Sequence, residues 1–477
     1  MSSKQCCSLL TAHCLLSTIK TLFTLTVFIT LASLDNAAAG VLPPLYAIIA
    51  RDLNATEGSL GLVTAVYLFV VAIAAIFWGY RGDQQRRKPL LFFSTLLWAT
   101  AMVFTAFAES YAQFFWWQIV TAVGVGGIAS VGFSVISDLV PAARRGLALA
   151  FWSISQGVGG SLGALLAGTM GAADWRLPFF FIAGLGFLFA FLYLFTYEPK
   201  RGQAEPELAS VFASGQSYNY RIRRDELLPM LRQGSTRWLL AASFTFALAY
   251  GSTLWIPRWA IARVQADGYD LQTATVAGNM FVALFSLGAF TAVLSGYLGD
   301  KWQKRNPRGR PLLVMGGLLA AIPFFVLLYF IPLQGLNLPD DATMLQMAVH
   351  IVFTLFTNPW VLLAFLAATL ALIFQAVDAP NWAAMMTDAN LPEHRGTIIG
   401  LSRLTRAVGS ALSVGIAGGL LERLAVPAPN NYAIALALFQ LVVIPTAFCY
   451  YRVSKTISQD VTAVRQTLTE RATNHRL

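Results

Sequence analysis

The chain has 477 residues, of which 57% are hydrophobic and 12% are charged. That charged share is about half of the usual share in soluble domains, so the chain has too little polar surface to cover a soluble globule of its length. The net charge of +10 lies mostly between apolar segments, which favours an orientation signal for a membrane over a nucleic-acid surface. The four cysteines show no metal-ligand spacing, and no Walker loop or nucleophile elbow occurs. We therefore predict neither an enzyme nor a cofactor.

Apolar segments of about 20 residues, each long enough to cross a bilayer, recur along the chain. They span residues 18–49, 58–80, 89–108, 112–138, 147–171, 177–196, 237–258, 272–298, 311–332, 360–387, 397–421 and 430–451. The sequence therefore predicts an all-α membrane protein with twelve transmembrane helices in two pseudo-symmetric six-helix bundles. The bundles are expected at 18–196 and 237–451, with a linker at 197–236 and tails at 1–17 and 452–477.

Basic residues gather in every second loop. They occur at 81–88, 144–145, 200–232, 301–310 and at Arg395, whereas the intervening loops are short and acidic or mixed. The positive-inside rule then places the basic loops, the linker and both termini in the cytoplasm. Short outer loops fit a bacterial inner membrane, and we expect the protein to be a monomer.

Two motifs occur once in each half. G-Y-R-G-D-Q-Q-R-R-K begins at Gly79, and G-Y-L-G-D-K-W-Q-K-R begins at Gly296. The other motif is an aspartate that lies seven residues before an arginine, with a glycine directly after the arginine. It occurs as Asp138 to Arg145 and again as Asp388 to Arg395. Two motif types, each recurring in its own half, indicate an internal duplication.

These features resemble the major facilitator superfamily over nearly the whole length of the chain. Gly79, Asp83, Arg87 and Lys88 match the family signature between helices 2 and 3, whereas Gln84 and Arg86 depart from it. The Asp-Trp-Arg run at 174–176 also looks like the family. The resemblance implies bundles that rock around a midplane cavity lined by helices 1, 4, 7 and 10.

Within that family the chain resembles spinster-like transporters. The likeness rests on Leu34-Asp35, the run Gly-Val-Leu-Pro at 40–43, Gly251, and Trp-Ile-Pro at 255–257. Helix 4 departs from it, because Gly127 stands where a glutamate is expected. The spinster likeness implies a lysolipid or other lipid-like substrate as an alternative to a small solute.

The repeated loops predict a gate on the cytoplasmic side. The pseudo-twofold relation places Asp83 near the helix start at Gly396 and Asp300 near the helix start at Gly146. A carboxylate beside a helix N-terminus stabilises by roughly 0.3–1 kcal/mol. The predicted gating residues are Gly79, Asp83, Arg87, Lys88, Gly296, Asp300, Arg305, Asp138, Arg145, Asp388 and Arg395. The alternative is that these charges act only as an orientation signal.

Buried polar residues predict the central cavity. Asp35 lies near the bilayer centre, where a lone carboxylate costs roughly 2.5–3.5 kcal/mol, so we expect a proton or substrate site or a hydrogen-bonded structural residue. Asp378 and Arg406 lie at equal depth on adjacent helices and are expected to pair, either to line the cavity or to neutralise each other. The predicted cavity residues are Asp35, Gln118, Trp255, Gln375, Asp378, Arg403 and Arg406.

We therefore expect a secondary active transporter that works by alternating access and couples to protons through Asp35. Its expected partners are a small or amphiphilic substrate, protons or another coupling ion, and membrane lipids, with no nucleic acid. A non-transporting membrane sensor is the alternative from another class, although a sensor need not preserve both gating loops.

Overall fold

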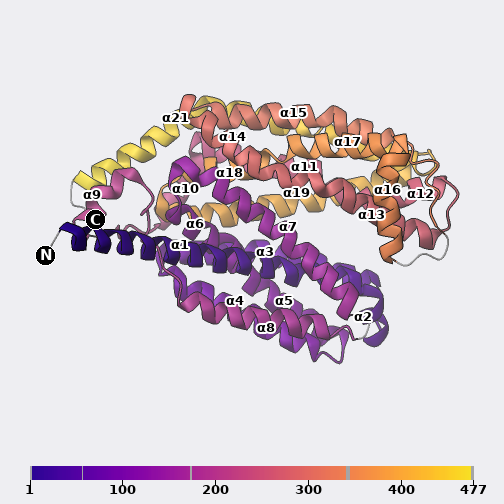
Figure 1. The fold of residues 1–477 in the computed structure, drawn as a ribbon, viewed down its shortest axis with the longest axis horizontal. Coiled ribbons are helices and arrows are strands. Elements are labelled where there is room, and N and C mark those ends of the chain that lie inside the picture. Colours follow the sequence, from indigo (N-terminus) through magenta and orange to yellow (C-terminus); the bar gives the residue numbers. More distant parts are fainter. Residues whose placement is uncertain (1–2, 56, 172–173, 217, 340–343, 474–477) are drawn as a thin grey trace. The chain divides into compact units, whose positions relative to one another are not determined.

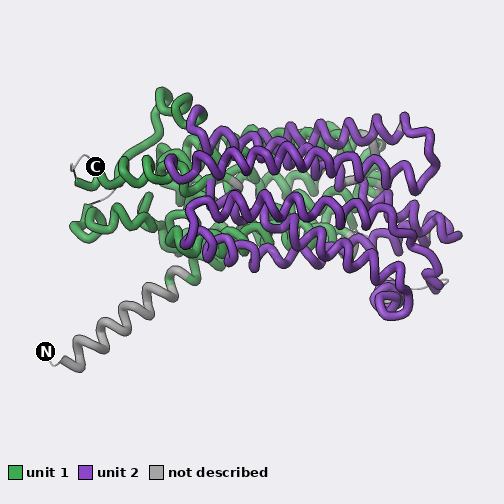
Figure 2. Tube along the Cα trace, turned by 90° about the horizontal axis from the view of Figure 1, so that it is seen from above, with its two compact units in different colours: residues 1–231, 386–404, 461–477 green, residues 232–385, 405–460 purple. Residues whose placement is uncertain are grey.

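The computed structural model describes residues 3–55, 57–171, 174–216, 218–339 and 344–473. This part of the chain is helical and contains no strand. Twelve of its helices or joined helices are long and apolar enough to cross a membrane, as the sequence predicts. Two compact units, coloured separately in Figure 2, divide the chain. Unit 1 holds residues 1–231, 386–404 and 461–477, and unit 2 holds residues 232–385 and 405–460.

Unit 1 contains the first six spans, which Figure 1 labels in chain order. Their helices are α1 (Ser3–Gly40), α3 (Glu57–Gln84), α4 (Arg87–Ala106), α5 (Tyr111–Gly127) with the π-helical turn η2 (Ile128–Gly132) and α6 (Phe133–Leu139), α7 (Arg145–Met170), and α8 (Leu177–Leu194). Shorter elements connect them, namely η1 (Pro43–Leu45), α2 (Tyr46–Asp52), η3 (Ala142–Arg144), η4 (Pro206–Leu208), α9 (Ala209–Ala213), η5 (Arg224–Glu226) and α10 (Leu227–Arg232).

Small residues bring α1 and α7 close together. A Cβ atom on Gly159 would collide with the Ser33 carbonyl, and one on Gly163 would collide with the Ala37 carbonyl. Because both obstacles are backbone atoms, only glycine allows this helix spacing. The close contact fixes the position of α1, which carries Asp35.

Unit 2 contains spans that are interrupted along their length. Its elements are α11 (Gly234–Tyr250), η6 (Gly251–Trp255), α12 (Ile256–Ala266), α13 (Leu271–Phe285), η7 (Ser286–Thr291), α14 (Ala292–Arg305), α15 (Gly309–Phe330), α16 (Met344–Thr357), α17 (Pro359–Gln375), α18 (Asp378–Asp388) and α20 (Asn430–Gln440). A break in a membrane helix leaves backbone N–H and C=O groups without partners in the helix. Breaks are therefore tolerated where the helix lines a cavity or packs within protein, and the freed groups can take part in a binding site. The break between α17 and α18 lies directly before Asp378.

Two long helices run through both units. The turn η8 (Pro392–His394) and the start of α19 (Arg395–Arg423) belong to unit 1, as does the end of α21 (Val443–Thr473). The segment predicted as a tail after residue 451 is thus helical as far as Thr473. Val453, Ile457, Val464 and Leu468 recur at helical spacing and are buried, which explains the extension. The predicted bundle boundaries at 197–236 stay a prediction, since residues 386–404 pack within unit 1.

Candidate functional site: a buried ion-pair network

The two copies of the Asp-to-Arg motif meet in unit 1 and exchange partners. Arg145 donates to Asp388, and Arg395 Nη1 lies 3.0 Å from Asp138 Oδ1. Each arginine opens a long helix, directly after the short turn η3 or η8. A cation in the first helical turn is unfavourable, so each arginine needs a carboxylate, and the opposite copy of the motif supplies it.

Glu205 of the linker joins the two arginines. Its Oε1 atom accepts hydrogen bonds from Arg145 Nη2 at 2.9 Å and from Arg395 Nη2 at 2.6 Å. Burial disfavours the charged form of Glu205, but the nearby charges of Arg395 and Arg145 hold its pKa at about 2. Glu205 is therefore an ionised part of the network at neutral pH. The sequence analysis missed this residue.

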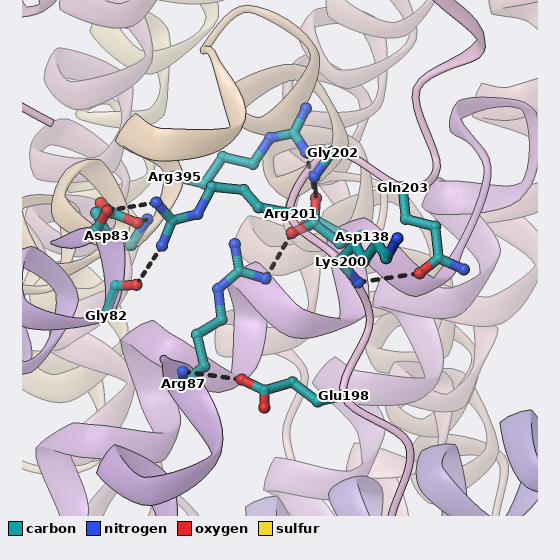
Figure 3. A network of polar contacts seen from close by, with 12 residues as sticks. Gly82, Asp83, Arg87, Asp138, Glu198, Lys200, Arg201, Gly202, Gln203 and Arg395 are labelled. Atoms are coloured by element: carbon teal, nitrogen blue, oxygen red, sulfur yellow. Dashed lines mark hydrogen bonds and ion pairs between the residues drawn. The ribbon is translucent and has the colours of Figure 1, made fainter. Parts of the chain in front are cut away.

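Arg87 extends the network to the start of α4. Its Nη1 atom lies 2.5 Å from Asp138 Oδ2, and its backbone N–H donates to Glu198 at 3.1 Å, as Figure 3 shows. Gly202 N–H donates to the other oxygen of Asp138 at 3.1 Å. Asp138 therefore binds two arginines and the linker backbone.

Asp83 caps the helix start at Gly396, as the repeat predicts. Its carboxylate accepts hydrogen bonds from Gly396 N at 3.0 Å, from Thr397 N at 2.6 Å and from Thr397 Oγ1 at 2.8 Å. A carboxylate beside the first turn of α19 is stabilised by these N–H groups and by the helix dipole. A Cβ atom on Gly79 would collide with the Gly396 carbonyl, so glycine there is needed for the close approach of α3.

Arg201 completes the charge balance. Its guanidinium donates to the Asp83 carbonyl at 2.5 Å and to the Gly82 carbonyl at 2.8 Å, as Figure 3 shows. Besides Glu198 at its edge, the network contains four arginines and four carboxylates, of which six are buried and two are half-buried, and buried charges need such pairing. They are Arg87, Arg145, Arg201 and Arg395 with Asp83, Asp138, Glu205 and Asp388.

The remaining predicted gating residues lie in three other places. Lys88 Nζ donates to the Thr196 carbonyl at 2.9 Å, beside the network. In unit 2, Gly296 is buried in α14, and Asp300 accepts a hydrogen bond from buried Arg310. Arg305 is exposed at the end of α14. Arg310 takes the buried position because it lies in the first turn of α15, which packs against α14.

Asp35 lies in a small cavity of unit 1. The cavity has a volume of about 100 Å³, and its polar lining residues are Asp35, Asn36, Tyr67, Gln156 and Arg403. Asp35 is 1% exposed, and within the described residues neither carboxylate oxygen accepts a hydrogen bond. The charge of Arg403 acts on this carboxylate across the cavity. The predicted residues Asp35 and Arg403 therefore share one site.

Asp378 and Arg406 form the pair that the sequence predicts in unit 2. Arg406 Nη2 lies 3.5 Å from Asp378 Oδ2, and the Tyr450 hydroxyl donates to Asp378. The Arg406 guanidinium also lies 4.8 Å from the ring centre of Trp382. This enclosure favours a self-neutralising structural pair, although the Arg406 side chain is 31% exposed.

The other predicted cavity residues are not among those that line the Asp35 cavity. Gln118 is buried and donates to Thr105 Oγ1 at 3.3 Å, so its amide holds α5 against α4. Trp255 lies half-buried in η6, and Gln375 is the half-buried last residue of α17.

Comparisons with known proteins identify relatives of this chain. The profile of the Major Facilitator Superfamily matches residues 25–345. Protein spinster homolog 1 of Xenopus laevis is 26% identical over 298 residues, which cover 61% of this chain and 55% of that protein. Protein spinster of Drosophila melanogaster is 24% identical over 281 residues, which cover 57% and 45%. The matched region spans about half the length of these curated relatives.

Solved structures share the fold. The human organic anion transporter MFSD10 has a TM-score of 0.62 at 15% identity, covering 90% of this chain and 99% of that chain. A bacterial homologue of the human lysosomal transporter Spinster, in an inward-facing and unoccupied conformation, has a TM-score of 0.53 at 18% identity, covering 92% and 98%. The predicted resemblance and fold class are confirmed.

Proposed function

Because this chain belongs to the major facilitator superfamily, a family of transporters and not of enzymes, we propose that it moves a small solute or amphiphile across a membrane by alternating access. The observation that carries this proposal is the buried network in which the two motif copies exchange partners. A purely orienting set of charges would not need to be buried or paired. We therefore assign the network to a latch that holds residues 386–404 against the first-half helices and opens once in each transport cycle.

Opening the latch would separate three contacts at once. The Arg145–Asp388 and Arg395–Asp138 pairs would part, and the first turn of α19 would lose the Asp83 carboxylate. Each buried partner left alone would need water or another partner. Such a set of contacts favours two discrete states over a continuous range, as alternating access requires.

Asp35 is our candidate for the coupling residue. A carboxylate that is buried and accepts no hydrogen bond within the described residues is costly in its charged form. Arg403, on the other side of the cavity, offers an opposite charge. We propose that Asp35 gains and loses a proton during the cycle, and that this exchange couples transport to a proton gradient.

An amphiphilic substrate is the more specific candidate. Apolar residues of the Asp35 cavity surround the single acid–base pair, namely Ala32, Ala39, Leu68, Val71, Val125 and Ile128. Apolar walls with few placed polar groups suit a ligand that has one polar end. At about 100 Å³ the cavity is smaller than the roughly 300–1,000 Å³ of ligand pockets, so it would have to widen during the cycle to admit such a ligand. The resemblance to spinster-like transporters implies the same class of substrate.

Flux into proteoliposomes tests the proposal. Purified protein would be given hydrophilic solutes and lipid-like amphiphiles, with and without an imposed pH gradient. We expect uptake of a member of the amphiphile set that increases with the gradient. Binding of a compound without any flux would instead support a sensor, and flux that ignores the gradient would refute proton coupling.

A further inference from the structure

A second cavity of unit 1 lies beside the latch. It has a volume of about 360 Å³ and forms where the turn between α3 and α4 meets two parts of the linker. Residues 84–87, 198–201 and 218–221 line it. The latch uses Arg87 and Arg201 from this set, but the transport proposal leaves the cavity itself without a role.

The lining is strongly basic. It contains five cations, Arg86, Arg87, Lys200, Arg201 and Arg221, and one carboxylate, Glu198. Glu198 Oε1 already accepts the backbone N–H groups of Arg87 and Lys88 at 3.1 and 3.2 Å, and its other oxygen lies 3.8 Å from Arg86. Arg87 is already paired with Asp138, but the four other cations outnumber Glu198, so the cavity has an excess of positive charge.

Two guanidinium nitrogens on this lining lack a partner. Among the described residues, the buried atoms Arg87 Nη2 and Arg201 Nε have no hydrogen-bond acceptor. The Arg87 side chain is almost fully buried, at 4% exposure. Burial, followed by the charge of Arg87, lowers the pKa of Arg201. Both nitrogens are themselves buried away from the cavity surface, so a ligand would reach them only after a shift of the two side chains. Unpaired donors beside like charges nevertheless favour an anionic ligand.

We infer that this cavity binds a phosphate group, carried either by a soluble anion or by a lipid head group. A phosphate offers several oxygens in the geometry that arginine forks match, and charge-assisted hydrogen bonds of this kind are strong. The polar lining, with amides and tyrosines beside the cations, excludes an apolar occupant. This site does not depend on the transport proposal.

The bound phosphate would stabilise the closed latch. Arg87 also binds Asp138, and Arg201 also binds the backbone of Asp83. A ligand that binds Arg87 and Arg201 in this arrangement favours the state in which the arrangement exists. Occupancy would therefore raise the population of the closed state.

Thermal unfolding in nanodiscs tests the inference. In one arm, inorganic phosphate is titrated against chloride at equal ionic strength, in phosphatidylcholine alone. In the other arm, phosphatidic acid replaces part of the phosphatidylcholine and the buffer contains no phosphate. We expect a saturable rise of the apparent Tm in at least one arm, and the responding arm identifies the soluble or the lipid source.

Paired variants supply the control. Lys200→Gln with Arg221→Gln removes two exposed cations of the lining and should weaken the apparent affinity by at least about tenfold. Arg224→Gln with Arg232→Gln removes two exposed cations outside the cavity and should leave it unchanged. The inference is overturned if neither arm shows a saturable shift, or if both double variants weaken it equally.

Discussion

Asp83 is the last residue but one of α3 and binds the first turn of α19, 313 residues further along the chain. Its carboxylate is fully buried, yet it accepts three hydrogen bonds from Gly396 and Thr397. These donors reach the carboxylate only while the two helices are in contact, so that contact stabilises the charge. A single side chain therefore links the state of the latch to the position of α19.

Replacing Asp83 by asparagine should weaken the latch. Asp83→Asn removes the charge that the helix N-terminus stabilises, and hydrogen bonds to charged groups contribute about 1.5–3 kcal/mol. We expect lower transport and at least about a tenfold shift toward the open latch. The measurement uses Ser137→Cys, at a buried position in the network, in a background without the four native cysteines. Its thiol should be alkylated faster when Asp83→Asn is also present than when Asp83 is intact.

The matched control is Asp225→Asn, an exposed aspartate of the linker, which should change neither quantity. Normal transport and an unchanged alkylation rate in Asp83→Asn would contradict the latch.

Asp35 is the residue that we propose couples transport to protons. Because Asp35→Asn cannot exchange a proton, the variant should lose the dependence of transport on pH between about pH 5 and pH 8. Binding of substrate should persist, since the amide keeps the size of the side chain. The pH profile of flux measures this, with the exposed Asp174→Asn as the control. A profile with the wild-type shape in Asp35→Asn would exclude Asp35 as the coupling site.

At the scale of the helices, the sequence predicts the features that depend on regular spacing along the chain. Hydropathy located the twelve spans, the duplicated motifs indicated that Asp83 meets Gly396, and equal depth on adjacent helices indicated that Asp378 pairs with Arg406. Each of these follows from spacing along regular helices. The exchange of partners between Arg145 and Arg395 was not predicted, because spacing within one motif does not say which copy supplies the carboxylate.

Contacts made by loops and ends were not predictable in the same way. Glu205 lies in an irregular linker, where no periodicity indicates which side chain turns inward. A charge count gives the missing signal. Arg87, Arg145 and Arg395 need more buried carboxylate than Asp138 and Asp388 provide, and the linker offers carboxylates in its Glu-Pro-Glu run at 205–207.

The last turns of α21 brace the turn before α19. Arg471 Nη1 lies 2.6 Å from Glu393 Oε1, donates to the Tyr218 hydroxyl and stacks 3.8 Å from the ring centre of Tyr220. Val464 and Leu468 pack beside it against the linker. Glu393 is 1% exposed, so it depends on this arginine for its charge partner.

Arg471→Gln should therefore detach the end of α21. Leaving one member of a buried pair alone costs about 3–5 kcal/mol, and we expect faster amide hydrogen exchange in residues 461–473. Arg465→Gln is the control on the same helix, because Arg465 is 61% exposed and lies 3.6 Å from Glu207. A surface pair of this kind contributes about 0–1 kcal/mol. Equal exchange in the two variants would show that apolar packing alone holds the segment.

At the scale of the whole chain, the linker is a structural part of the latch. It supplies Glu205 to both motif copies, Arg201 to the backbone of α3, and Gly202 to Asp138. A linker that only tethered two bundles would need none of these contacts. If the network opens as we propose, the linker must move with it.

The pKa of Glu205 fixes how this linker contact responds to pH. Its folded value of about 2 lies below the ordinary value of 4.5, so ionised Glu205 stabilises the folded chain at any pH above about 4.5. That contribution, on the order of 3 kcal/mol, is lost as the pH falls from 4.5 toward 2.

The apparent Tm of Glu205→Gln should thus lie below that of the wild type by a constant amount between about pH 8 and pH 5, and the gap should close only in stronger acid. Glu109→Gln, an exposed position, should show no gap at any pH. If the gap for Glu205→Gln already closed near neutral pH, Glu205 would be the titrating group of the latch, and proton coupling would have to be reassigned from Asp35 to the linker.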